Sequence, residues 1–113
     1  MLKATEKLFK IFADKNRLRI FNLLEQRKMC VCELASILEV TQPSISRHLK
    51  RMKEVGLVAD EQDKFWTNYY LKKNGKPQQD ILCCIRHLLK GDKTIQSDLK
   101  KLKKVDRTKM CCG

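Results

Sequence analysis

Residues 41–56 read TQPSISRHLKRMKEVG, and this stretch decides the fold. Proline is tolerated in the first turn of a helix and glycine is common just after the last turn, so Pro43 and Gly56 delimit a helix over residues 43–55. On a helical wheel with 100° per residue, three apolar side chains share one side: Ile45, Leu49 and Met52. The stretch therefore predicts an amphipathic helix whose apolar side packs on a core.

The other side of this helix is basic. Between residues 42 and 53 there is no acidic residue and there are four basic ones: Arg47, Lys50, Arg51 and Lys53. Ser44 and Ser46 lie toward the edges of the basic side, and His48 lies between the two sides. Exposed arginine, lysine and hydroxyl groups on a helix suit the major groove of DNA. An ordinary solvated basic surface is the alternative, and the absence of acidic residues favours DNA.

Apolar spacing predicts further elements around this helix. Helices are expected over residues 4–13, after the N-cap Asp14, over about 32–39, over 78–90, and in a final basic segment, and the aromatic-rich residues 57–71 favour a β-hairpin. The expected core sides include Phe9 in the first helix and Leu88 in the helix over 78–90. The predicted fold is mainly α with a small β-hairpin, a winged helix-turn-helix of four helices, a hairpin and one or two further helices. We expect a DNA-binding and dimerisation domain over 1–90, followed by a basic helix and a cysteine-containing tail over 91–113.

Length and charge limit the function. The 113 residues suit a single domain. The 25 basic against 13 acidic side chains give a net charge of +12, which predicts a polyanionic partner, with nucleic acid first and an anionic membrane surface second. Apolar runs are far shorter than the roughly 20 residues that span a bilayer, so we expect a cytoplasmic protein with no membrane partner. The sequence has no Ser-His-Asp order, paired catalytic carboxylates or glycine-rich phosphate loop. It predicts a protein that is not an enzyme and needs no cofactor to bind DNA.

Four stretches resemble successive motifs of the ArsR/SmtB family, and the resemblance covers about residues 4–90. They are ADKNRLRI (13–20), MCVCEL (29–34), TQPSISRHLK (41–50) and GLV (56–58). The resemblance implies a homodimeric, cytoplasmic repressor that leaves double-stranded operator DNA when a metal or metalloid binds. The expected DNA contacts are Gln42, Ser44, Ser46, Arg47, His48, Lys50, Arg51 and Lys64.

The hairpin tip departs from the family pattern. Members usually have glycine and then arginine there, whereas this chain has Asp63-Lys64-Phe65-Trp66 after Asp60 and Glu61. Acidic groups repel phosphates, so we expect the hairpin to add little affinity for DNA. Lys64 is its one basic candidate.

Cys30 and Cys32 match the first two thiols of the family's arsenic-sensor motif, C-V-C-D-L-C. Ala35 replaces the third thiol, and As(III) or Sb(III) prefers three soft thiolate ligands, so the pair is incomplete by itself. Residues two apart on an ideal helix point about 200° apart, so chelation by both would require local unwinding, which suggests how an inducer disturbs DNA binding. The alternative is that both cysteines are small buried hydrophobic residues.

Two other cysteine pairs could complete the site. Cys111 and Cys112 lie in the tail, and Cys83 and Cys84 are adjacent in the helix over 78–90, with Cys84 at the edge of its apolar side and Cys83 nearly opposite. The two pairs rank equally from the sequence, and vicinal cysteines bind arsenic in some family members. The leading ligand set is Cys30, Cys32, Cys111 and Cys112, with As(III) or Sb(III) as inducer.

Other inducers and functions are weaker alternatives. Zinc-sensing members use Asp and His ligands on the last helix, but here Leu82 stands in place of the first His and His87 is the only His there. Cadmium and lead sensors share the C-V-C element and add cysteines in an N-terminal extension; no Cys precedes position 30, so they are the runner-up. A thiol-based metal-binding protein is a further alternative, against which the outward basic helix argues.

Overall fold

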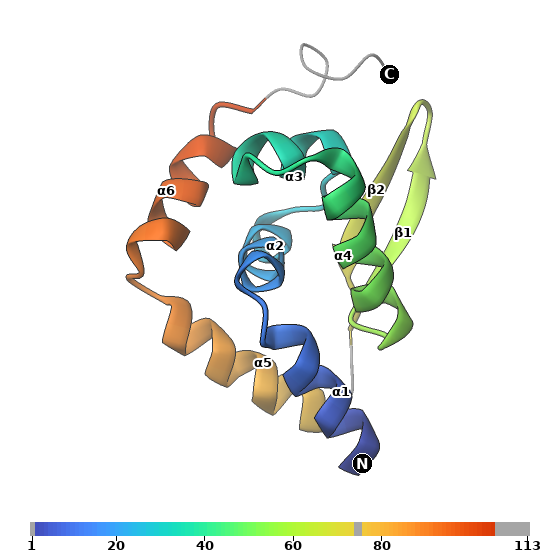
Figure 1. Cartoon of the computed structure of the whole chain (residues 1–113), viewed down its shortest axis with the longest axis vertical. Coiled ribbons are helices and arrows are strands. Elements are labelled where there is room, and N and C mark those ends of the chain that lie inside the picture. Colours follow the sequence, from blue (N-terminus) through green and yellow to red (C-terminus); the bar gives the residue numbers. More distant parts are fainter. Residues whose placement is uncertain (1, 74–75, 106–113) are drawn as a thin grey trace.

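The computed structural model describes residues 2–73 and 76–105 (Figure 1). The predicted order of elements is confirmed, including the last helix. The elements are α1 (Leu2–Phe12), α2 (Lys15–Gln26), α3 (Val31–Leu38), α4 (Gln42–Glu54), β1 (Val58–Asp63), β2 (Trp66–Leu71), α5 (Lys76–Leu89) and α6 (Lys93–Leu102).

Side-chain caps explain where three helices begin. Asp14 accepts a hydrogen bond from the Arg17 backbone N–H at 3.0 Å, which confirms it as the N-cap of α2. Thr41 caps α4 by accepting the N–H of Ser44 at 3.4 Å, and Asp92 caps α6 in the same way. Each cap satisfies a backbone donor that the first turn leaves without a helical partner.

The core surrounds α2, which lies in the middle of the molecule with the other helices and the hairpin around it (Figure 1). The apolar side predicted for α4 is confirmed, since Ile45, Leu49 and Met52 are all fully buried. They pack in one cluster with side chains from α2 and α3, including Phe21 and Leu34. The basic helix is thus held rigidly by its apolar side.

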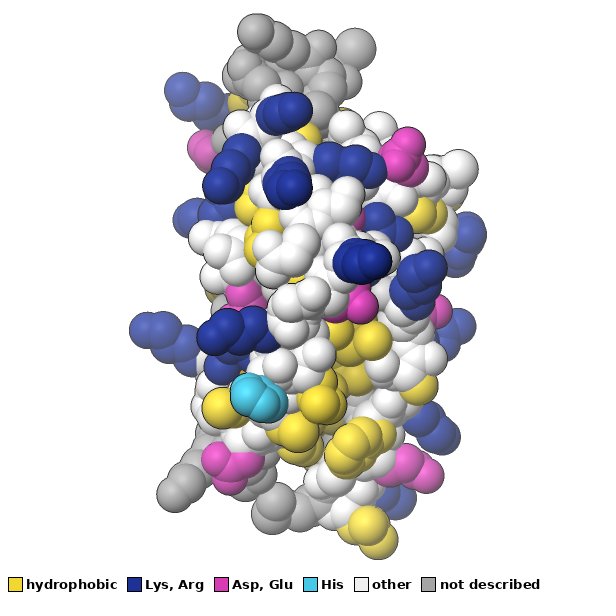
Figure 2. Space-filling view, turned by 90° about the vertical axis from the view of Figure 1, so that its left-hand side faces the viewer, with side chains coloured by type: hydrophobic (Ala, Val, Ile, Leu, Met, Phe, Trp, Pro, Cys, Tyr) yellow, Lys and Arg dark blue, Asp and Glu magenta, His cyan; other side chains and the backbone are white. Residues whose placement is uncertain are grey.

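Two predicted core positions are wrong. Phe9 on α1 is 58% exposed and Leu88 on α5 is 70% exposed. The other described elements cover only part of the apolar side of each of these two helices, so the remainder of that side is exposed. Hydrophobic side chains accordingly gather on the lower part of the face in Figure 2, where α5 lies, while lysine and arginine side chains gather above them over α6.

The hairpin is antiparallel and is tied to the segment before α3. Its register runs from Val58 opposite Leu71 to Asp63 opposite Trp66. Met29 and Tyr69 exchange two backbone hydrogen bonds of 3.0 and 2.8 Å, forming an isolated bridge. This bridge fixes the start of α3 relative to the hairpin.

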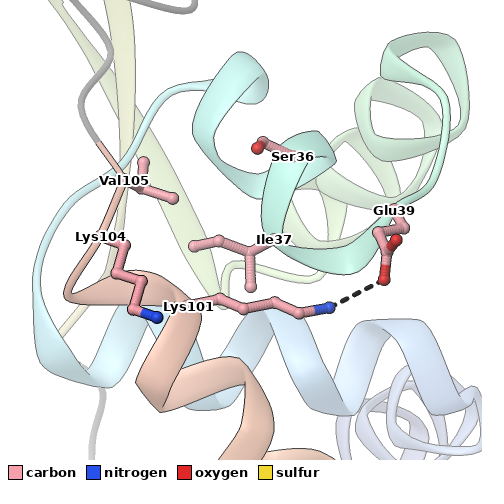
Figure 3. A pocket seen from close by; sticks show the side chains of 6 residues that line it. All are labelled: Ser36, Ile37, Glu39, Lys101, Lys104 and Val105. Carbon is pink, nitrogen blue, oxygen red and sulfur yellow. Dashed lines mark hydrogen bonds and ion pairs between the residues drawn. The ribbon is translucent and has the colours of Figure 1, made fainter.

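Helix α6 packs on α2 and α3. The Arg19 guanidinium donates two hydrogen bonds of 2.9 Å to the buried carboxylate of Asp98, and Lys101 pairs with Glu39 at 2.8 Å. The Lys101–Glu39 pair borders a hollow of about 300 Å³ between α3 and the end of α6 (Figure 3), lined by Ser36, Ile37, Glu39, Lys101, Lys104 and Val105. None of the helices in the described ranges has the length and apolar character needed to cross a membrane.

Candidate DNA interface and thiol site

The outward side of α4 carries the predicted DNA contacts. Seven of the eight predicted contacts lie on α4, and Lys64 lies on the hairpin. Ser44 and His48 are half-buried, and the exposed ones are Gln42, Ser46, Arg47, Lys50 and Arg51. Because the opposite side of α4 is anchored in the core, this basic side is presented as a rigid surface. Its length and charge suit a major groove, which admits one α-helix.

One flank of this surface is hollowed. Ser44, Arg47, His48 and Arg51 of α4 line a hollow of about 440 Å³ together with Asp14 and Arg17 from the start of α2. Asp14 and Arg17 were not among the predicted DNA contacts. Both residues belong to the motif at residues 13–20, but nothing in that motif indicates that they lie beside α4.

The environment of this hollow lowers the pKa of His48. Burial is the main cause, and the positive charges of Arg17, Arg47 and Arg51 act in the same direction, while the carboxylate of Asp14 opposes them. The neutral imidazole is therefore favoured in the folded protein.

The hairpin places its single basic candidate at the tip, where Lys64 is exposed and has a left-handed φ of 56°. The acidic residues near it are partly neutralised. Asp60 pairs with Lys53 at 3.0 Å and Glu61 pairs with Lys28 at 2.6 Å. These pairs reduce the repulsion that the hairpin exerts on phosphates.

Cys30 and Cys32 lie at the start of α3, but not both inside it. Cys30 is the N-cap, with an extended backbone (φ −91°, ψ 169°), and is buried, whereas Cys32 is in the first turn and half-buried. The expectation that the two thiols lie 200° apart on an ideal helix is therefore wrong, because one of them precedes the helix. The carboxylate of Glu33 accepts the Cys30 backbone N–H at 3.1 Å and pairs with Arg27 at 2.8 Å, so the cap is firmly held.

A contact joins this thiol pair to α4. The side-chain amide of Gln42 donates a hydrogen bond to Sγ of Cys32, with an N–S distance of 3.6 Å. Gln42 is the first residue of α4. A predicted thiol ligand and a predicted DNA contact are thus directly connected, which the sequence did not indicate.

Two of the four remaining cysteines, Cys83 and Cys84, lie in the described part of the chain. Cys83 and Cys84 are both exposed on α5, so a core role, which the position of Cys84 at the edge of the apolar side favoured, is wrong for Cys84. Cys111 and Cys112 lie outside the described residues. Within the described ranges, no group of three or more His, Cys, Asp or Glu side chains is arranged to hold a metal ion.

Comparisons with known proteins place the chain in a family. Residues 14–60 match the family described as bacterial regulatory protein, arsR family. The chain is 36% identical over 96 residues to the arsenical resistance operon repressor of Bacillus subtilis, covering 81% of this chain and 91% of that protein. It is 48% identical over 65 residues to the repressor of the same name from Escherichia coli, a match that spans 57% of this chain and 56% of that protein.

A solved structure shares the fold. Reduced HlyU from Vibrio cholerae superimposes with a TM-score of 0.66 at 28% identity, over 77% of this chain and 86% of that one. The described helices and hairpin are those of a winged helix-turn-helix, a fold that binds DNA. The family and the relatives are regulators of transcription and not enzymes. The chain belongs to the ArsR family of bacterial regulatory proteins and is a DNA-binding transcriptional regulator.

Proposed function

We propose that this regulator is a repressor that leaves its operator when As(III) or Sb(III) binds to Cys30, Cys32 and a third thiolate. The observation that carries the proposal is the hydrogen bond from Gln42 to Sγ of Cys32, which joins the thiol pair to the first residue of the basic helix α4. The similarity to two arsenical resistance operon repressors supports the choice of inducer. A DNA-binding repressor of this kind acts in the cytoplasm.

The third thiolate comes from Cys111 or Cys112 in this proposal. Val105 lines a hollow beside Ser36 and Ile37 of α3, so the described chain ends next to the helix that begins at the thiol pair. Cys111 is the sixth residue after Val105, and an extended chain spans at most about 20–22 Å between the two. The eight residues of α3 span only about 12 Å. A thiol at position 111 or 112 can therefore reach the start of α3.

Binding of the ion competes with the contact to Gln42. Once Sγ of Cys32 donates electrons to As(III), it is a poorer acceptor for the Gln42 amide and is drawn toward the other ligands. Gln42 then loses a restraint on its position at the start of α4, and the orientation that contacts DNA becomes less favourable. Coupling between two sites of this kind typically amounts to 1–3 kcal/mol, about 5- to 150-fold in affinity.

A homodimer completes the proposal. Phe9 on α1 and Leu88 on α5 are exposed apolar side chains that a second copy can cover. Two copies related by a twofold axis present two α4 helices to successive major grooves, as helix-turn-helix dimers do. Cys83 and Cys84, exposed on α5, form the alternative partner pair for Cys30 and Cys32 or a separate site.

The test is a fluorescence-anisotropy titration of reduced protein on a labelled duplex from its own promoter. Arsenite, antimonite, cadmium and zinc are then added in turn. Release by arsenite and antimonite with zinc inert supports the proposal, release by cadmium alone favours the cadmium and lead class, and DNA binding that none of the ions changes refutes the inducer.

Two variants test arsenite binding by the thiol pair and DNA binding by α4 separately. Cys32→Ser is expected to bind DNA and lose the response to arsenite, and a retained response excludes Cys32 as a ligand. Arg47→Ala is expected to weaken DNA binding while arsenite binding is kept. Unchanged DNA affinity in Arg47→Ala argues against the basic side of α4 as the DNA interface.

A further inference from the structure

The hollow beside α4 gathers positive charge that the protein itself leaves largely uncompensated. Three guanidinium groups line it, from Arg17, Arg47 and Arg51, against a single carboxylate, that of Asp14. The three guanidinium groups and the one carboxylate give the lining a net charge of +2, without counting His48. No ion pair holds Arg47 or Arg51 within the described chain, and both side chains are exposed.

Arg17 is already held in place at the edge of this hollow. Its Nε donates to the backbone carbonyl of Ile11 at 2.9 Å, and a terminal nitrogen reaches the carbonyl of Lys10 at 3.5 Å. The same terminal nitrogen lies 4.0 Å from a carboxylate oxygen of Asp14, and the side chain is only 14% exposed. Because the end of α1 immobilises this guanidinium, a ligand that binds it does not have to order a flexible side chain.

The α4 residues in the hollow form one stripe along the helix. Ser44, Arg47 and Arg51 are spaced by three and four residues, so their side chains lie above one another on the flank that faces α2. Ser46 and Lys50, also exposed, lie on a neighbouring stripe that turns away from α2. The outward side of α4 thus has two parts with different surroundings.

We propose that this hollow binds one phosphate of the DNA backbone, held by Arg17 together with Arg47 and Arg51, and that Ser46 and Lys50 are left to face the bases. Guanidinium groups form paired hydrogen bonds with phosphate oxygens, and the hydroxyl of Ser44 adds a further donor. Inorganic phosphate offers the same chemistry, but the position of the hollow along an exposed basic helix favours the DNA backbone. This assignment rests on the proposed function, in which α4 contacts the operator, and adds α2 to the interface.

The experiment compares Arg17→Gln and Arg51→Gln with wild type and with Lys15→Gln in the full-length reduced protein. Lys15→Gln removes one positive charge from an exposed position on the same helix, outside the hollow, and is the matched control. Affinity is measured at several salt concentrations on the promoter duplex and on an unrelated duplex. Since Arg17 also donates hydrogen bonds to carbonyls of α1, thermal unfolding checks that Arg17→Gln still folds. Arg51 forms no ion pair within the described residues, so Arg51→Gln is an independent variant.

Log affinity falls linearly with log salt concentration, and the loss of one phosphate contact makes this fall less steep by about 0.9. Between 50 and 200 mM salt, wild type should therefore lose about 3.5-fold more affinity than either hollow variant. Both variants should weaken binding to the two duplexes by the same factor, because a phosphate contact carries no sequence information. The double variant should lose less than the product of the two single losses, since both residues hold the same phosphate.

Four results overturn the assignment. Slopes of Arg17→Gln and Arg51→Gln equal to that of Lys15→Gln refute it while leaving the proposed function intact, and so does a loss confined to the promoter duplex, which indicates base contacts. Stabilisation of the protein by inorganic phosphate with unchanged DNA slopes assigns the hollow to a small anion instead. Failure of the wild type to bind either duplex refutes the proposed function, and the phosphate site with it.

Discussion

Replacing Gln42 by alanine is expected to weaken the coupling between arsenite and DNA. The change removes the hydrogen bond from the side-chain amide to Sγ of Cys32, an N–S contact of 3.6 Å between side chains near the surface. The net free energy of such a hydrogen bond is about 0.5–1 kcal/mol, equivalent to roughly two- to fivefold in an equilibrium constant. The ratio of DNA dissociation constants with and without arsenite should therefore shrink by about two- to fivefold.

The assay is a pair of anisotropy titrations for each variant, one with reduced protein alone and one with saturating arsenite. Ser46→Ala is the matched control, because Ser46 is also an exposed, predicted DNA contact on α4. Within the described residues, Ser46 forms no hydrogen bond to a cysteine, whereas Gln42 does. The control should raise both dissociation constants by the same factor and leave their ratio unchanged. If Gln42→Ala behaves like Ser46→Ala, Gln42 is only a DNA contact and the link from Cys32 to α4 is refuted.

Three further predictions concern stability. Glu33→Ala leaves the buried N–H of Cys30 without its carboxylate acceptor and should lower the free energy of unfolding by about 1–3 kcal/mol in urea titrations; a change below about 0.5 kcal/mol contradicts the cap. Asp98→Ala leaves Arg19 without its bidentate partner and should cost about 3 kcal/mol by the same measurement, whereas wild-type stability would show that the pair does not anchor α6. The pKa of His48 is lowered by burial and by neighbouring arginines, so the unfolded chain binds a proton near pH 6.5 more readily than the folded protein does. This contribution to stability is complete above about pH 6.5 and is lost as the pH falls through the lower folded pKa; His48→Gln should flatten that decline, and an unchanged decline would exclude His48.

Much of the fold was readable from local sequence because its signals are local. The spacing of Ile45, Leu49 and Met52 identified the buried side of α4, and the predicted N-cap Asp14 lies where α2 begins. Aromatic residues predicted the hairpin. The motifs around residues 13–58 were sufficient to indicate the family that the comparisons confirm.

Local spacing fails where the width of an apolar stripe differs from the area that covers it. Phe9 and Leu88 have the periodicity of core residues and are exposed, because periodicity reports which side of a helix is apolar and not how much of that side is covered. Cys30 shows a related failure. Its place one residue before α3 depends on a cap with Glu33, and helix ends are the least certain part of a pattern.

The sequence by itself determined the elements, the basic side of α4 and the presence of a thiol pair. Only the tertiary structure decided that Arg17 lies beside Arg47 and Arg51, and that Gln42 contacts Cys32. Both juxtapositions join residues of different helices, so they depend on the angles at which α2 and α3 pack against α4. Those angles arise from how the buried side chains of all three helices fit together, a collective property that no single stretch of sequence encodes.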